Sequence, residues 1–268
     1  MIYLNKYNLE HKLLRGSVLY LGDIPTYKVT LGEMADNGFV TMQSVISILT
    51  MDDTKASELF NAEFENPSTF IFIYYSILQE IHRIKEGLVN EKDWDGLLLN
   101  TIPLFLSMFF KRQVTFHEKY GFIIGENDED IKVLNDRNYD EFRLILKERN
   151  CLIDLDETED VDNPANEMAR KLLEKQKMLR EKVRKAKQAR GDDEGLTMAD
   201  LISIFAEAEH MPLQDVYDNY DVYQFNNQFN RLKIMDDFHV NIQALLAGAK
   251  SEEVKLQHWL SKIKKQED

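Results

Sequence analysis

The sequence predicts a mainly α-helical protein with a small β element, and three observations lead to this fold class. Apolar residues recur at helical spacing from Phe39 onward, which is the pattern of amphipathic helices. Two groups of short apolar segments bounded by turn residues indicate a little sheet. A charge-dense stretch then divides the chain. We therefore expect an α+β N-terminal domain over 1–153, a connecting segment over 154–195 and a small all-α C-terminal domain over 196–268.

The strand signals come first and again after the middle of the N-terminal domain. Ser17–Leu21 and Ile24–Leu31 flank Gly22-Asp23, which suits a short hairpin turn, and Pro25 favours an edge position. The second group is separated by turn-rich residues and consists of Val114–Phe116, Gly121–Ile124 and Ile131–Leu134.

Helices are predicted over Thr54–Phe64, Pro67–Glu86, Glu91–Lys111 and Asn138–Arg149. Pro67 suits the first turn of its helix and Gly87 suits the end. Phe70–Leu78 is apolar almost all round, so it is either a central helix or a strand buried on both faces, and the length of the surrounding segment favours the helix. Pro103 is expected to kink or divide the helix that contains it.

The connecting segment changes charge sharply along its length. Asp154–Asp162 holds six acidic residues in nine, and Ala165–Arg190 carries ten Lys or Arg against three Glu. Its apolar positions allow only a narrow stripe, so we expect a solvated basic helix between two domains. Because this run lacks interleaved aromatic residues and lies beside the acidic block, nucleic-acid binding is not expected.

The C-terminal part contains the strongest helix start. Asp221 is expected to be an N-cap, with Gln224 completing a capping box. Behind it, an apolar stripe at helical spacing forms either a small core or a partner surface, and consists of Val222, Phe225, Phe229 and Leu232. Three tyrosines surround this start and are the candidate partner-binding residues: Tyr217, Tyr220 and Tyr223.

Composition narrows the class of protein. The chain has 268 residues, 44% of them hydrophobic, and a formal net charge of -14, which favours solubility and argues against a general nucleic-acid coat. Nothing at the start resembles a signal peptide, and the most apolar run, Gly96–Phe110, is shorter than the roughly 20 residues that span a bilayer. We expect no membrane segment.

No pattern of catalytic, cofactor-binding or metal-ligating residues is visible. The six histidines lack the His-Glu-x-x-His spacing, and no glycine-rich phosphate loop is present. Glu126–Asp130 is rich in carboxylates, but Ile131 stands where a calcium loop of the hand type needs glycine. Cys151, the only cysteine, has no neighbouring basic cluster that would lower its pKa. We expect a protein without enzymatic activity, cofactor or metal.

Three segments together resemble one family. Tyr27–Met34 is an extended stretch that ends in a Thr-Leu-Gly-Glu helix start. Asn138–Asp154 is followed, after the acidic block, by Asn163-Pro164 and the Lys-rich run. The C-terminal helix begins Val-Tyr-Gln-Phe, ends its first stripe in Arg-Leu, and is followed later by His258–Leu260. In this order, the segments resemble tail assembly chaperones of long-tailed bacteriophages.

The resemblance implies a non-enzymatic protein that binds the tape measure protein, or other phage tail proteins, and keeps it soluble during tail morphogenesis in the host cytoplasm. It also implies a family that often makes a short form and a frameshifted long form. Self-association stays open. The alternative interpretation is a structural tail or neck component that is retained in the virion.

Overall fold

The computed structural model describes most of the chain as two compact units, each of which is considered separately. The first comprises Met1–Leu152 with Gln214–Asp268, and the second comprises Ile153–Leu213. This division differs from the predicted domains because it separates 196–213 from the rest of the expected C-terminal domain. The basic helix expected over 165–190 lies outside the described residues. Those described are 6–59, 68–88, 97–126, 131–152, 196–248 and 258–260.

The first unit begins with α1 (Lys6–Leu14) and a small hairpin of β1 (Leu19–Leu21) and β2 (Ile24–Thr26). The two strands pair antiparallel with Leu21 opposite Ile24, which confirms the hairpin predicted around Gly22-Asp23. Thr26 is fully buried, and its hydroxyl donates a hydrogen bond to Leu19 O at 3.0 Å. This bond replaces the water that the hydroxyl loses on burial.

Three short helices follow: α2 (Leu31–Asp36), α3 (Phe39–Leu49) and α4 (Asp53–Leu59). Thr30 caps α2, and Glu33 completes a capping box, because its side chain accepts a hydrogen bond from the Thr30 backbone N–H at 2.9 Å. The predicted Thr-Leu-Gly-Glu helix start is therefore confirmed.

Two apolar helices form the centre of this unit: α5 (Thr69–Lys85) and α6 (Leu98–Phe110). The apolar segment Phe70–Leu78 lies within α5, which confirms helix rather than strand. The helix begins at Thr69, with Ser68 as its N-cap, two residues later than predicted. Of the two outcomes expected at Pro103, a kink or a division, the division does not occur, because α6 continues through this residue as one helix. Six buried residues of α6 hold it against its neighbours despite the missing backbone N–H.

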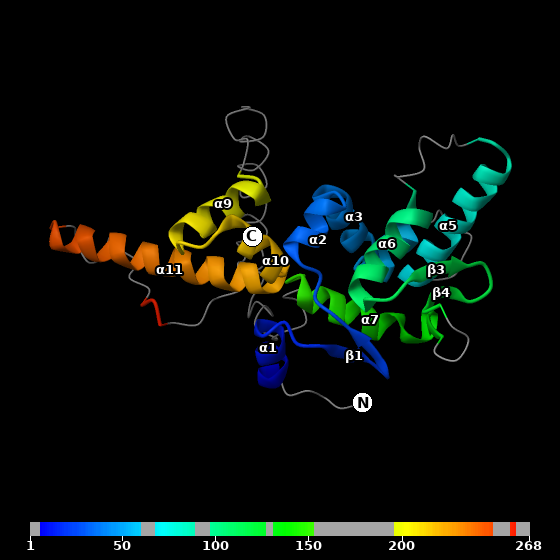
Figure 1. Ribbon diagram of the computed structural model, residues 1–268, viewed down its shortest axis with the longest axis horizontal. Helices are drawn as coiled ribbons and strands as arrows, with labels where there is room; N and C mark the ends of the chain where they lie inside the picture. Colours follow the sequence, from blue (N-terminus) through cyan, green and yellow to red (C-terminus); the bar gives the residue numbers. More distant parts are fainter. Residues whose placement is uncertain are drawn as a thin grey trace, which may run out of the picture. The chain divides into compact units, whose positions relative to one another are not determined.

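A three-stranded antiparallel sheet completes the predicted β element: β3 (Val114–His117), β4 (Gly121–Ile124) and β5 (Lys132–Leu134). Helix α7 (Asp136–Arg149) follows it with a capping box at Asn135. In Figure 1, α5 and α6 lie beside the β3–β4 hairpin, and α7 contacts both the helical and the strand elements. The mainly α fold class with a small β element is confirmed.

The core of the first unit lies among α3, α5, α6, α7 and the β3–β5 sheet. It is rich in aromatic rings. Phe142 packs edge-on against Phe109 at 5.6 Å and is stacked on Phe110 at 6.2 Å between ring centroids. Tyr139 is also buried, and its hydroxyl donates to Leu49 O at 2.8 Å, so its polar end is satisfied inside the core.

The C-terminal helices of the described chain are α9 (Met198–Ala208), α10 (Leu213–Asn219) and α11 (Val222–Leu246). Helix α9 belongs to the second unit and has its own capping box at Thr197 and Asp200. Helix α11, 25 residues long, belongs to the first unit. The capping box predicted at Asp221 and Gln224 is confirmed.

Candidate partner-binding site

The start of α11 is joined to the start of α2 by the backbone. Thr30 and Asp221 form an antiparallel β-bridge, and the Leu31 N–H donates to Tyr220 O at 2.9 Å. Thr30 and Asp221 are also the N-caps of their helices. We call these four residues the cap junction. It brings two helix starts together, so segments about 190 residues apart in sequence fix each other's positions.

Hydrogen bonds of the Gln224 side chain connect the cap junction to the N-terminal segment. Its Oε1 accepts from the Asp221 N–H and from Lys28 Nζ, both at 3.2 Å, and its Nε2 donates to Leu14 O at 2.9 Å. Lys28 Nζ also donates to Asn219 O at 2.5 Å. The amide therefore uses both ends of its side chain, and a carboxylate or an aliphatic residue could not make the same set of bonds.

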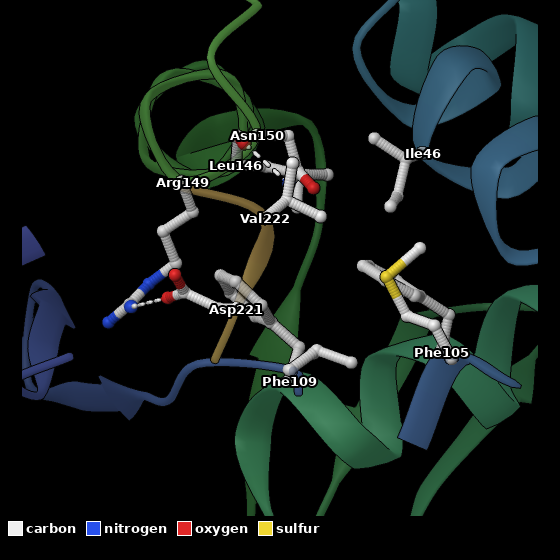
Figure 2. A pocket seen from close by; sticks show the side chains of 10 residues that line it. Ile46, Phe105, Phe109, Leu146, Arg149, Asn150, Asp221 and Val222 are labelled. Atoms are coloured by element: carbon white, nitrogen blue, oxygen red, sulfur yellow. Dashed lines mark hydrogen bonds and ion pairs between the residues drawn. The ribbon is translucent and has the colours of Figure 1, made fainter. Parts of the chain in front are cut away.

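A buried ion pair lies beneath the cap junction. Arg149 Nη1 is 3.8 Å from Asp221 Oδ2, and the two side chains are only 3% and 4% exposed. Arg149 Nη2 donates to Ser17 O at 2.8 Å and to Thr26 O at 3.3 Å. Figure 2 shows the two side chains facing each other. Because Arg149 ends α7, the pair joins the end of one helix to the start of another.

Burial shifts the pKa of both partners. Loss of solvent lowers the pKa of the Arg149 guanidinium to about 10, although Asp221 acts in the opposite direction. Burial likewise raises the pKa of Asp221, which the Gln224 N–H and Arg149 only partly oppose. Arg149 Nε and Nη1 and Asp221 Oδ2 form no hydrogen bond. Desolvation of the two charged groups therefore costs more free energy than their mutual attraction supplies.

The cavity beside the ion pair is too small for an organic ligand. Its volume is about 10 Å³ for a water-sized sphere, which is the room that one water needs. Seven of its ten lining residues are apolar, and Arg149, Asn150 and Asp221 contribute the polar part of its walls (Figure 2). The lining residues include Val29, Ile46, Phe105, Phe109, Arg149 and Asp221. The contacts of this site therefore connect α7, α11 and the β1–β2 hairpin.

The three predicted partner-binding tyrosines lie around the cap junction. Tyr217 is in α10, Tyr220 lies between the helices, and Tyr223 is in the first turn of α11; all three are half-buried. A Cβ at Gly32 would lie 3.2 Å from Tyr217 O, so this part of α10 lies close against α2. Burial, with a smaller contribution from Glu10, raises the pKa of Tyr223 to about 12. The structure thus brings the tyrosines to one region where each is partly covered by its own chain.

Helix α11 itself is the larger exposed feature. Phe225 is the only buried residue among its 25. The predicted stripe, here called the first stripe (Val222, Phe225, Phe229 and Leu232), packs against the core through Val222 and is stacked ring on ring at Phe225 and Phe229. A second stripe escaped the sequence analysis: Met235, Phe238, Ile242 and Leu245. It has the same i, i+3, i+7, i+10 spacing, which could have revealed it.

In the described part of the chain, no group of three or more His, Cys, Asp or Glu side chains could hold a metal ion. Within the same residues, no helix is both long enough and apolar enough to cross a bilayer. Cys151 is exposed, and four residues of the Glu126–Asp130 turn, 127–130, lie outside the described chain.

These features define a mainly α-helical protein with two small antiparallel sheets and a long, largely unburied helix near its C-terminal end. Residues 185–264 match the family model of the YomV second domain. YomV is a Bacillus phage protein, and the match indicates a phage protein without specifying its role. No curated protein and no solved structure matches the chain.

Proposed function

We propose that this chain is a non-enzymatic phage tail assembly chaperone that binds the tape measure protein and keeps it soluble. One observation carries the proposal: α11 extends over 25 residues but buries only Phe225. Leu246 is 83% exposed, Val240 56% and Met235 38%. Among the described residues, apolar side chains of α11 thus stay exposed, and such surface offers a contact for another protein.

The physical requirements of such a chaperone agree with this surface. A tape measure protein is expected, from the resemblance, to expose long apolar helical stripes before the tail tube forms around it. Covering them requires a partner with helix-length apolar surface and a strongly charged exterior, because the complex must stay soluble. The chain supplies both, with its net charge of -14. The phage family match and the resemblance of the chain to tail assembly chaperones support the same proposal.

Co-expression with the tape measure protein of the same phage tests the function. We expect the tape measure protein to move from the insoluble to the soluble fraction and to co-purify with this chain. If the wild-type chain neither captures it nor improves its solubility, the proposal is wrong. Mass spectrometry of purified virions tests the alternative, since a retained tail or neck component would be present in stoichiometric amounts.

The tyrosines require a separate variant. Replacing Tyr217, Tyr220 and Tyr223 with Ser is expected to weaken capture while far-UV circular dichroism stays nearly unchanged. Tyr20→Ser is the matched control because this tyrosine is 60% exposed on β1. If capture persists while the helical signal falls, the tyrosines are structural residues of the cap junction and not client contacts.

A further inference from the structure

The two apolar stripes of α11 face different sides of the helix. The second stripe repeats the spacing of the first after 13 residues, from Val222 to Met235. Each helical residue turns by about 100°, so this offset places the centres of the stripes about 140° apart around the axis. Phe225 is 1% exposed and Val222 packs against the core of the first unit, so the first stripe is covered there. The same contacts cannot cover the second stripe.

Residues 258–260 contact α11 on the side of the second stripe. Arg231 Nη1 donates a hydrogen bond to Trp259 O at 2.9 Å. Phe238, which belongs to the stripe, lies beside the His258 ring with 5.2 Å between ring centroids. Arg231 precedes Phe238 by seven residues, which is about 20° short of two full turns, so both residues lie on the same side of the helix. The contacts of this C-terminal segment therefore converge on one face of α11.

The His258 ring joins Phe238 of α11 to Trp259. It is tilted against the Phe238 ring and stacked on the Trp259 ring, with 5.9 Å between the last two centroids. Both separations lie in the range of favourable aromatic contacts. Phe238 is half-buried, whereas its neighbours Asp237 and His239 are exposed. Phe238 is thus covered where the ring of the C-terminal segment faces it.

We infer that His258-Trp259-Leu260 is a latch that closes the second stripe from within the chain. The occupant of this face is a segment of the same chain, and Phe238 is not available to another protein while the latch is closed. The match to the YomV second domain covers residues 185–264, so α11 and the latch lie in the same matched region. The latch goes beyond the proposed function and does not depend on it, because it requires no partner.

Little buried surface holds the latch in place. Trp259 is 41% exposed and Leu260 is 68% exposed. Met235, on the same stripe, is 38% exposed. Because burial of apolar surface provides most of the stabilisation of a packed segment, we expect the latch to open by local unfolding while α11 stays helical. Opening uncovers Phe238.

The fluorescence of Trp259 tests the latch in the full chain. The chain has two tryptophans, so Trp94→Phe gives a parent protein in which Trp259 is the only one. Arg231→Leu keeps an apolar side chain but removes the donor to Trp259 O. We expect this variant to raise the acrylamide quenching constant of Trp259 about twofold, because the residue passes from 41% to full exposure when the latch opens. Far-UV circular dichroism should stay unchanged.

Lys233→Leu is the matched control. Lys233 carries the same charge as Arg231, is exposed, and lies about 200° around the helix from it, so its variant should be quenched like the parent protein. Phe238→Ala should raise the quenching constant as Arg231→Leu does. Because an open latch cannot be opened again, the two changes together should add nothing to either alone.

Three results would overturn the latch. The first is a quenching constant of the parent protein equal to that of the urea-unfolded chain, and the second is an equal rise with Lys233→Leu. The third is quenching of the parent protein that falls as its concentration rises, since residues 258–260 would then pack on a second copy. If Arg231→Leu loses helical signal, Phe238→Ala decides: a rise in quenching without loss of helix supports the latch, and no rise refutes it.

Discussion

Replacement of Arg149 by methionine tests whether the buried ion pair holds the cap junction. The variant keeps a long apolar side chain but removes the charge that faces Asp221 at 3.8 Å and the donor to Ser17 O and Thr26 O. An uncompensated buried charge costs about 3–5 kcal/mol. We therefore expect Arg149→Met to lower the free energy of unfolding by about that amount at pH 7.

The double variant Arg149→Met/Asp221→Asn separates the charge from the lost hydrogen bonds. Asparagine caps a helix about as well as aspartate, so the start of α11 is retained. The remaining loss of stability comes from the backbone carbonyls of Ser17 and Thr26, which no longer have their donor, and amounts to about 1–3 kcal/mol. Urea denaturation of the wild type and the three variants of this cycle gives the coupling between the two residues. A loss below about 1 kcal/mol for Arg149→Met, or a double variant no more stable than that single variant, would refute the reasoning.

The pH dependence of the single variant has a definite sign. Burial already raises the pKa of Asp221 in the folded chain, and removal of Arg149 raises it further. The folded state then binds the proton more tightly than the unfolded chain. The free energy of unfolding of Arg149→Met should therefore fall, relative to the wild type, as pH rises from about 3.9 through the folded-state pKa. The double variant should lack this dependence.

Three further predictions concern stability. Phe225→Ala should cost about 3–5 kcal/mol in urea denaturation because the ring is 1% exposed; a loss below about 1 kcal/mol would place this ring outside the core. Gly121→Ala should cost about 1–2 kcal/mol or more, since φ is +88° and the new Cβ would lie 2.9 Å from Leu134 O. Gly22→Ala, where nothing lies within 4 Å, should cost less, and equal losses would contradict the close approach at Gly121. Finally, a melting curve in chelator should match that of the untreated protein; a large loss of stability, or a stoichiometric metal by elemental analysis, would show that a metal supports the fold.

Local patterns predicted most elements of the fold but not α1, whereas pairing across the chain required the structure. The capping box at Asp221 and the helix start at Thr30 were visible because each cap and its partner lie three residues apart. The β-bridge between the same two residues was not, since no local signal links positions so far apart. Pro103 does not divide α6, because buried contacts that no local propensity reports keep the helix continuous.

In the candidate site, too, local sequence patterns do not show which distant residues come together. In the sequence, Arg149 looks like an ordinary basic residue at the C-terminus of a helix. Only the structure shows that it is buried and paired with Asp221. The first stripe was recognised from its spacing, but spacing does not show which stripe the chain itself covers. The tyrosines were found from their position around the predicted helix start, and their partial burial at the cap junction followed only from the structure.

The late position of Asp221 in the chain has a consequence for folding during translation. Asp221 follows Arg149 by 72 residues, so at about 5–20 residues per second the ribosome adds Asp221 about 4–14 s after Arg149. During that interval the guanidinium has no carboxylate to face, and the surface that Val222 later covers stays open. The N-terminal part of the fold therefore cannot be completed until most of the chain has been synthesised. A product that stops at the acidic block would keep the surface that Val222 covers exposed.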